Sequence, residues 1–227
     1  MNVFERFTGP ADQVMCLAYE EADRLRHDYV GPEHVLAGLG RQEHGRTSGI
    51  LQAAGLNVEA IRAQLDRLVD AGMLPGPWRS NSELLHTLGV DLSAVRRAVE
   101  DTFGSEAVCA AHRRVLGRSR LREDRIVCGS PLSGKAMLAK RALSLASKEA
   151  DGMGQDDISP EHVLLGVLRD AQDPLGGPRP GRRIRRIRAY LGLPQHGPSP
   201  VRLVIEASGT TLHALRGEVL AELHAAS

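Results

Sequence analysis

The sequence predicts an all-α fold, and three observations support that prediction. Aromatic residues make up only 3% of the 227 residues, so the core has to be built from Leu, Val, Ile, Ala and Met. Such a composition favours helix packed on helix over a β-sandwich. Apolar residues recur at three- and four-residue steps, the period of an amphipathic helix. One stretch of this pattern occurs twice along the chain, which indicates a duplication.

The first helix is expected between residues 11 and 25, whose apolar positions share one face: Val14, Leu17, Ala18, Ala22 and Leu25. The same spacing continues in residues 61–68 and again in residues 142–150. No alternating stretch is long enough to predict a strand of useful length.

The duplication is clearest in residues 30–39 and 158–167. Both copies read apolar, small, Pro, Glu, His, two apolar residues, a variable residue, Gly and an apolar residue. In each copy the small residue suits a helix N-cap, the proline the first helical position and the glutamate the second. Upstream, Glu21-Ala22 recurs as Glu149-Ala150 at the same offset.

A second pattern, a short apolar helix followed by a glycine turn and an amphipathic helix, occurs three times. Each copy has a glycine where a helix C-cap needs positive φ, followed two residues later by a side chain suited to an N-cap. The pairs are Gly55 with Asn57, Gly89 with Asp91, and Gly209 with Thr211.

Segments rich in turn-forming residues predict the domain organisation. Residues 72–82 are rich in Gly, Pro and Ser and read as a connector. We therefore expect a first repeat at 1–72, a connector with an extra helical half-repeat (82–103) at 73–130, and a second repeat at 131–227. An Arg-rich inserted loop at about 173–200 interrupts the second repeat.

Several segments of the chain resemble the Clp N-terminal repeat, which is found at the start of ClpC- and ClpA-type unfoldases. They are the opening Phe4-Glu5-Arg6-Phe7-Thr8, the helix around Ala22, the run from Tyr29 to Leu36 and the later glycine turn. The resemblance implies two four-helix repeats related by a pseudo-twofold axis. Because no nucleotide-binding modules follow in this chain, we expect a free-standing copy of the recognition domain, acting as adaptor or as decoy.

The resemblance also implies partners. These are damaged or arginine-phosphorylated substrate proteins, Clp adaptors, a ClpC-type unfoldase, and antibiotics that target the ClpC N-terminal domain. Two departures concern the site: Pro32 and Pro160 stand where the family has Thr. In the second copy, Leu132-Ser133 is expected to replace the opening Phe-Thr, with about one extra helical turn before Leu145.

Glu33 and Glu161 are the principal candidates for ligand binding. A helix N-terminus favours an anion, and a neighbouring carboxylate can accept a guanidinium. Phosphoarginine carries both groups, so we expect phosphate near Thr8 and guanidinium on Glu33. Simple capping of the helix dipole by each glutamate is the alternative. The full expected site comprises Thr8, Val30, Gly31, Pro32, Glu33, Ser133, Ile158, Ser159, Pro160 and Glu161, with Phe4 and Phe7 for protein docking.

Other features predict no chemistry. His34 and His162 are expected to be structural. Cys109 and His112 supply only two ligands, so we expect no metal. No Ser-His-Asp set, Cys-His set or carboxylate pair stands out, so we expect no cofactor and no enzyme. The sequence of Gly129–Ala136 nearly matches the motif of a phosphate-binding loop. Ala136, however, stands at the position where the motif requires Ser or Thr to hold magnesium.

The net charge is +1, which argues neither for nor against nucleic acid as a partner. A nucleic-acid-binding regulator that uses the basic segment Arg179–Arg188 is the alternative function, although a solvated loop is the default interpretation. The N-terminus lacks a signal-peptide pattern and no stretch could span a bilayer. We therefore expect a cytoplasmic monomer with reduced cysteines.

Overall fold

The computed structural model describes residues 3–27, 29–42, 45–76, 102, 136–173, 185, 188–189, 193 and 198–225. The chain divides into two units, one formed by residues 1–76 and 135–227 and the other by residues 77–134. Apart from Thr102, the second unit lies outside the described residues. That unit contains the expected half-repeat with Gly89 and Asp91, so the division at 72 and 130 stays a prediction.

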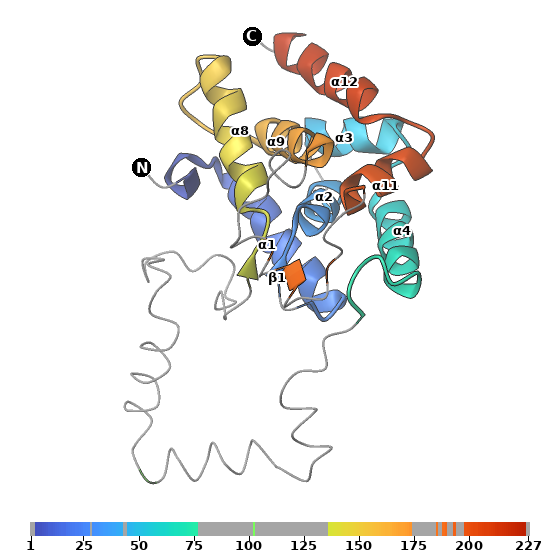
Figure 1. Ribbon diagram of the computed structural model, residues 1–227. Coiled ribbons are helices and arrows are strands. Elements are labelled where there is room, and N and C mark those ends of the chain that lie inside the picture. The colour runs from blue at the N-terminus through green and yellow to red at the C-terminus, as the bar shows by residue number, and fades with distance from the viewer. Residues whose placement is uncertain are drawn as a thin grey trace. The chain divides into compact units, whose positions relative to one another are not determined.

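The described residues form helices, and the prediction of an all-α fold is confirmed (Figure 1). The first repeat contains a short 3-10 helix η1 (Val3–Arg6), α1 (Gly9–Arg24), the two-residue strand β1 (Tyr29–Val30), α2 (Pro32–Gly40), α3 (Arg46–Ala53) and α4 (Val58–Asp70). The second contains the two-residue strand β2 (Ala136–Met137), α8 (Lys140–Gly152), α9 (Pro160–Gln172), α11 (Pro200–Ala207) and α12 (Leu212–Ala225).

Local chemistry explains where these helices begin and end. The Asn57 side chain accepts a hydrogen bond from the backbone N–H of Ala60 at 2.8 Å, which caps α4. Thr211 caps α12 in the same way at 3.1 Å. Gly55 and Gly209 have φ of 73° and 83° and follow α3 and α11, so the predicted glycine turns are confirmed at both described copies.

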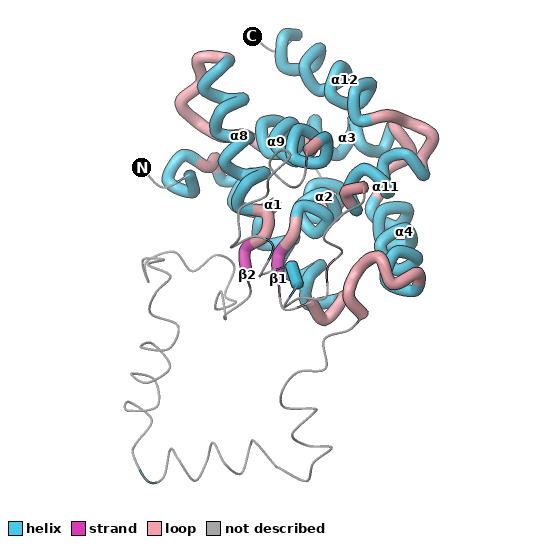
Figure 2. The backbone as a smooth tube through the Cα atoms, viewed as in Figure 1, coloured by secondary structure: helices cyan, strands magenta, loops and turns pink. Residues whose placement is uncertain are grey.

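The two repeats exchange their strand segments. Phe7 forms a parallel bridge with Ile158, just before α9. Reciprocally, β1 pairs in parallel with β2, which places Val30 beside Met137 just before α8 (Figure 2). In each repeat, the segment before the first helix therefore pairs with the segment before the second helix of the other repeat. A pseudo-twofold arrangement requires this reciprocal pairing.

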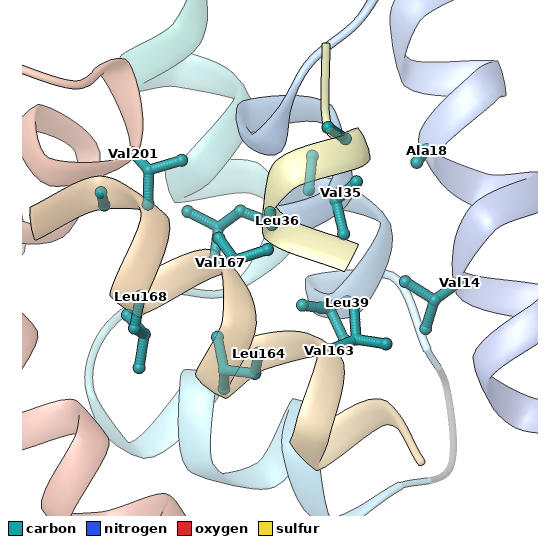
Figure 3. Packing of buried hydrophobic residues seen from close by; sticks show 14 of the residues in the cluster. Val14, Ala18, Val35, Leu36, Leu39, Val163, Leu164, Val167, Leu168 and Val201 are labelled. Carbon is teal, nitrogen blue, oxygen red and sulfur yellow. The ribbon is translucent and has the colours of Figure 1, made fainter. Parts of the chain in front are cut away.

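The core lies where α2 and α9 cross. Figure 3 shows Leu36 of α2 beside Val167 of α9, with Val14 and Ala18 of α1 facing α2; all are fully buried. The later helices cross over in the same reciprocal way, because α3 packs against α12 and α4 against α11. Burial of apolar side chains from both repeats in one core, at about 1.5–3 kcal/mol for each large residue, explains why the repeats fold together.

Two glycines allow the helix pairs of each repeat to approach. A Cβ on Gly38 would lie 2.7 Å from the backbone O of Val14, and one on Gly166 would lie 2.5 Å from the backbone N of Ala146. Both distances are too short for a carbon contact, so α1 with α2 and α8 with α9 pack backbone to backbone. This is the physical reason for the glycine in the duplicated motif.

One expectation needs correction. Met137 pairs with Val30 as Phe7 pairs with Ile158, so Met137 rather than Leu132 is the counterpart of Phe7. Helix α8 has 13 residues and α1 has 16, so no extra helical turn precedes Leu145. Leu193, in the expected inserted loop, is buried in the core (7% exposed).

Candidate functional site

The start of α9 and the N-terminal segment form the first candidate site. The backbone N–H of Ile158 donates to the carbonyl of Arg6 at 2.7 Å, and the N–H of Thr8 donates to the carbonyl of Ile158 at 3.1 Å. The Thr8 hydroxyl donates to the same carbonyl at 3.3 Å. Thr8 is therefore bonded to Ile158, which lies three residues before Glu161. The expectation that Thr8 lies beside Glu33 is wrong because the repeats exchange strands.

The helix start itself has the predicted register. Ser159 is the N-cap of α9, and Pro160 and Glu161 are the first two helical residues. Pro160 is buried, whereas Ser159 and Glu161 are half-buried. The N–H of Ser159 donates to Nδ1 of His162 at 3.1 Å, so this histidine fixes the cap, and its predicted structural role is confirmed.

Arg6 holds the N-terminal segment in place. Its guanidinium donates to Ser147 Oγ at 2.8 Å and to the carbonyl oxygens of Gln155 and Asp156 at 3.0 and 2.6 Å. It also forms an ion pair with Asp151 at 2.7 Å. The sequence analysis missed Arg6 as a positioning residue, because its four partners lie more than 140 positions away.

The start of α2 forms the second candidate site. Here the N–H of Leu138 donates to the carbonyl of Val30 at 2.9 Å, as that of Thr8 does to Ile158. Leu138 is thus the counterpart of Thr8, and it has no hydroxyl. Ser133, expected to supply that hydroxyl, lies outside the described residues. Gly31 is the N-cap and Pro32 the first helical residue, as predicted.

Glu33 differs sharply from Glu161. It is 4% exposed, and its Cδ lies 2.6 Å from the point that a Cβ on Gly31 would occupy. Burial raises the pKa of Glu33, although the hydrogen bond from its own backbone N–H and the charge of Arg188 act in the opposite direction. The carboxylate therefore fills the helix start itself, and it does not line an open pocket.

A chain of two buried histidines lies beneath this second site. The N–H of Gly31 donates to His34 Nδ1 at 2.9 Å, so His34 Nε2 carries the proton and lies 2.9 Å from His27 Nδ1. His27 Nε2 then donates to the carbonyl of Pro75 at 3.0 Å, and its ring stacks on Tyr29. The predicted structural role of His34 is confirmed. His162, by contrast, has no partner for Nε2 within the described ranges.

Of the two expected docking residues, Phe7 is buried in the core (8% exposed) while Phe4 is half-buried. Their ring centroids lie 5.2 Å apart. Phe7 therefore contributes packing, and only Phe4 presents part of its surface.

Each repeat also contains a buried glutamate surrounded by arginines. Glu21 accepts from Arg24 and Arg62 and forms an ion pair with Arg41 at 3.2 Å. Burial raises the pKa of Glu21, but the hydrogen bonds from Arg62 and Arg24 and the nearby positive charges outweigh it, so the pKa lies below its usual value.

Glu149 repeats this arrangement in the second copy, with Arg169 and Arg216 at 3.0 and 2.7 Å. These networks tie three helices together in each repeat. The signal was present in the sequence, since Glu21 and Arg62 recur as Glu149 and Arg216 within the duplicated motifs.

The remaining sequence candidates carry no described site. Cys109, His112 and Gly129–Ala136 lie outside the described residues, as does most of Arg179–Arg188. Among the residues that the structure does describe, no group of three or more His, Cys, Asp or Glu could hold a metal ion. Nor is any described helix long and apolar enough to cross a membrane.

Comparison with known proteins agrees with this geometry. Residues 6–76 match the Clp repeat (R) N-terminal domain. The chain is 30% identical over 170 residues to chaperone protein ClpB of Oceanobacillus iheyensis. It is 26% identical over 170 residues to the negative regulator of genetic competence ClpC/MecB of Bacillus subtilis. Each match covers 75% of this chain but only 14% of the relative, so the chain spans about one seventh of these proteins.

The fold has a solved counterpart in the N-terminal domain of the chaperone ClpD from Arabidopsis thaliana. The TM-score is 0.52 at 16% identity, and the superposition covers 98% of this chain and 97% of that one. The Clp N-terminal domain is a non-catalytic protein-interaction module. The chain is thus homologous to the N-terminal domains of ClpC-, ClpA- and ClpB-type chaperones, and its residues 6–76 match the Clp repeat.

Proposed function

We propose that this chain is a non-catalytic recognition module of the Clp proteolysis system, which binds substrate or adaptor proteins and acts as adaptor or as decoy. The mark that it recognises is phosphoarginine. The observation that carries this proposal is the Thr8 hydroxyl beside the start of α9, whose second residue is the half-buried Glu161.

The chemistry of the α9 start suits a ligand with both signs of charge. The helix N-terminus carries a partial positive charge that favours phosphate. The Thr8 hydroxyl is bonded to the carbonyl of Ile158, and Ser159 is the N-cap of the helix. Glu161 supplies a carboxylate for the guanidinium.

The partners follow from the same chemistry. They are damaged or arginine-phosphorylated proteins, Clp adaptors or a ClpC-type unfoldase, bound by a monomer in the cytoplasm. Antibiotics that target the ClpC N-terminal domain bind the same surface, and the half-buried Phe4 adds apolar contact to docked proteins.

Isothermal titration calorimetry with free phosphoarginine tests the proposal, with unmodified arginine as the ligand control. We expect saturable binding of phosphoarginine alone, loss of binding in Glu161→Gln and weaker binding in Thr8→Val. Glu218→Gln, which changes an exposed glutamate of α12, is the matched control and should bind as the wild type does. Absence of heat from phosphoarginine at millimolar concentration in the wild type would exclude the phosphoarginine site.

A further inference from the structure

The N-terminal segment brings part of the α9 site from the opposite repeat. Figure 1 shows η1 beside α8, against which it packs. Phe7 is buried and fixes the segment to the core, but the residues on either side of it reach Ile158 only through the short bridge described above. A pairing of so few backbone bonds opens readily on its own. The position of the Thr8 hydroxyl therefore depends on further contacts of the segment.

Arg6 supplies those contacts. Its side chain is 15% exposed, and its guanidinium binds two side chains of α8 and two carbonyl oxygens of the connection that leads into α9. Hydrogen bonds from a guanidinium are charge-assisted, and its planar fork holds several acceptors at once. The guanidinium thus joins the segment that contains Thr8 to the connection that leads to Glu161. Its partners are Ser147, Asp151, Gln155 and Asp156.

The counterpart positions at the start of α2 are apolar. The pairing register places Ala136 at the position that Arg6 has in the other site. It places Leu138 at the position of Thr8. Neither side chain can donate a hydrogen bond, so these positions provide neither the guanidinium contacts nor the hydroxyl of the α9 site.

The two glutamates differ in the same direction. Glu33 is 4% exposed and its carboxylate lies against Gly31, whereas Glu161 is half-buried. A carboxylate has to be accessible to accept a guanidinium from a ligand. Among the residues that the structure describes at the two helix starts, the hydroxyl, the arginine and the accessible carboxylate come together only at α9.

We propose that the chain has one phosphoarginine site, at the start of α9, and that Arg6 is the positioning residue that makes this helix start competent. The identity of the ligand rests on the proposed function. The role of Arg6 in holding Thr8 at Ile158 does not.

Isothermal titration calorimetry with free phosphoarginine tests both parts, at a temperature where circular dichroism shows every variant folded. The wild type should bind one phosphoarginine per chain. Arg6→Met should lower the affinity by about tenfold or more, because the hydroxyl is no longer held in place. Arg24→Met, which removes a guanidinium that binds Glu21 and Asp66 in the first repeat, is the matched control and should keep the wild-type affinity.

Two results of the titration would overturn the proposal. One is a stoichiometry of two equivalent sites per chain. The other is an Arg6→Met variant that binds phosphoarginine as tightly as Arg24→Met does.

Amide hydrogen exchange gives a readout that needs no ligand. In Arg6→Met the amides of Thr8 and Ile158 should exchange faster than in the wild type. Those of Leu138 and Ala139, which are bonded in the matching pairing of the other repeat, should keep their rates. Equal acceleration of both pairs indicates a general loss of stability, and unchanged exchange at Thr8 and Ile158 indicates that Arg6 does not hold the segment; either result contradicts the positioning role.

The two readouts separate this proposal from the proposed function. If the wild type binds no phosphoarginine, the proposed function and the single site both fail. The exchange rates still decide whether Arg6 holds Thr8 at the start of α9.

Discussion

Substitution of Gly166 by alanine should open the contact between α8 and α9. The added Cβ would lie 2.5 Å from the backbone N and 2.9 Å from the Cα of Ala146, and closer still to the carbonyl O of Ala142. Heavy-atom contacts are optimal at about 3.5 Å, so the two helices must separate by roughly 1 Å. All three neighbours are backbone or Cα atoms, and none can rotate away.

The magnitude follows from two opposing effects. Overpacking of a core contact costs about 1–3 kcal/mol, and the tightness at Gly166 places it at the upper end. Alanine in a helix interior recovers about 1 kcal/mol relative to glycine. We therefore expect Gly166→Ala to lower the free energy of unfolding by about 2 kcal/mol, which lowers the thermal midpoint by roughly 4–8 °C.

Two other glycines provide the comparison. Gly38 occupies the matching position in the first repeat, but its Cβ would lie 2.7 Å from Val14 O and 2.9 Å from Ala18 N, so Gly38→Ala should cost about 1 kcal/mol. Gly217 of α12 has nothing within 4 Å of its Cβ position, so Gly217→Ala should stabilise by about 0.5–1 kcal/mol.

Urea denaturation followed by circular dichroism measures all three variants. The expected order of stability is Gly217→Ala, wild type, Gly38→Ala and then Gly166→Ala. If Gly166→Ala is as stable as Gly217→Ala, the close backbone approach of α8 and α9 is wrong.

Three further perturbations follow from the buried polar groups. Glu21→Gln should cost about 1–3 kcal/mol at neutral pH; because the pKa of Glu21 is lowered on folding, its contribution is complete above the unfolded pKa and is lost as pH falls through the folded value. Burial raises the pKa of Asp170 to about 6, so its contribution to stability decreases as pH rises from about 4 to about 6, by at most about 3 kcal/mol, and Asp170→Asn should remove that dependence. His27→Leu should cost about 1–3 kcal/mol, because it leaves His34 Nε2 and the Pro75 carbonyl without their partner.

Stability curves measured between pH 3 and pH 8 check the two carboxylates, with Glu218→Gln as the exposed control. A Glu21→Gln variant whose loss of stability is the same at pH 3 and pH 7 would contradict the ion-pair account, as would an unchanged pH slope in Asp170→Asn. For His27→Leu, hydrogen exchange at residues 74–76 is the more specific readout, and unchanged protection there would argue against the histidine chain.

Much of the fold follows from patterns that extend over only a few residues. Apolar spacing predicts the helices, Asn57 and Thr211 predict caps, and Gly55 and Gly209 predict turns, because each depends on backbone conformation within one or two helical turns. The duplicated motif likewise predicts that Ser159 or Gly31, the following proline and the glutamate begin a helix.

The candidate site was harder to predict, since its partners come from opposite repeats. The sequence placed Thr8 beside Glu33, but the strand exchange places it beside Ile158, 150 positions away. The alignment of Leu132-Ser133 failed for the same reason, because only the pairing of Val30 with Met137 shows which residue is the counterpart of Phe7.

The amino-acid sequence by itself determined that this protein is helical and duplicated, since helix period, caps and turn glycines are local properties. Its motifs also resemble the Clp N-terminal repeat. Only the tertiary structure decided that the glutamates differ, with Glu161 half-buried and Glu33 buried. The physical reason is that burial depends on which distant segments pack together, whereas the local motif is shared by both copies.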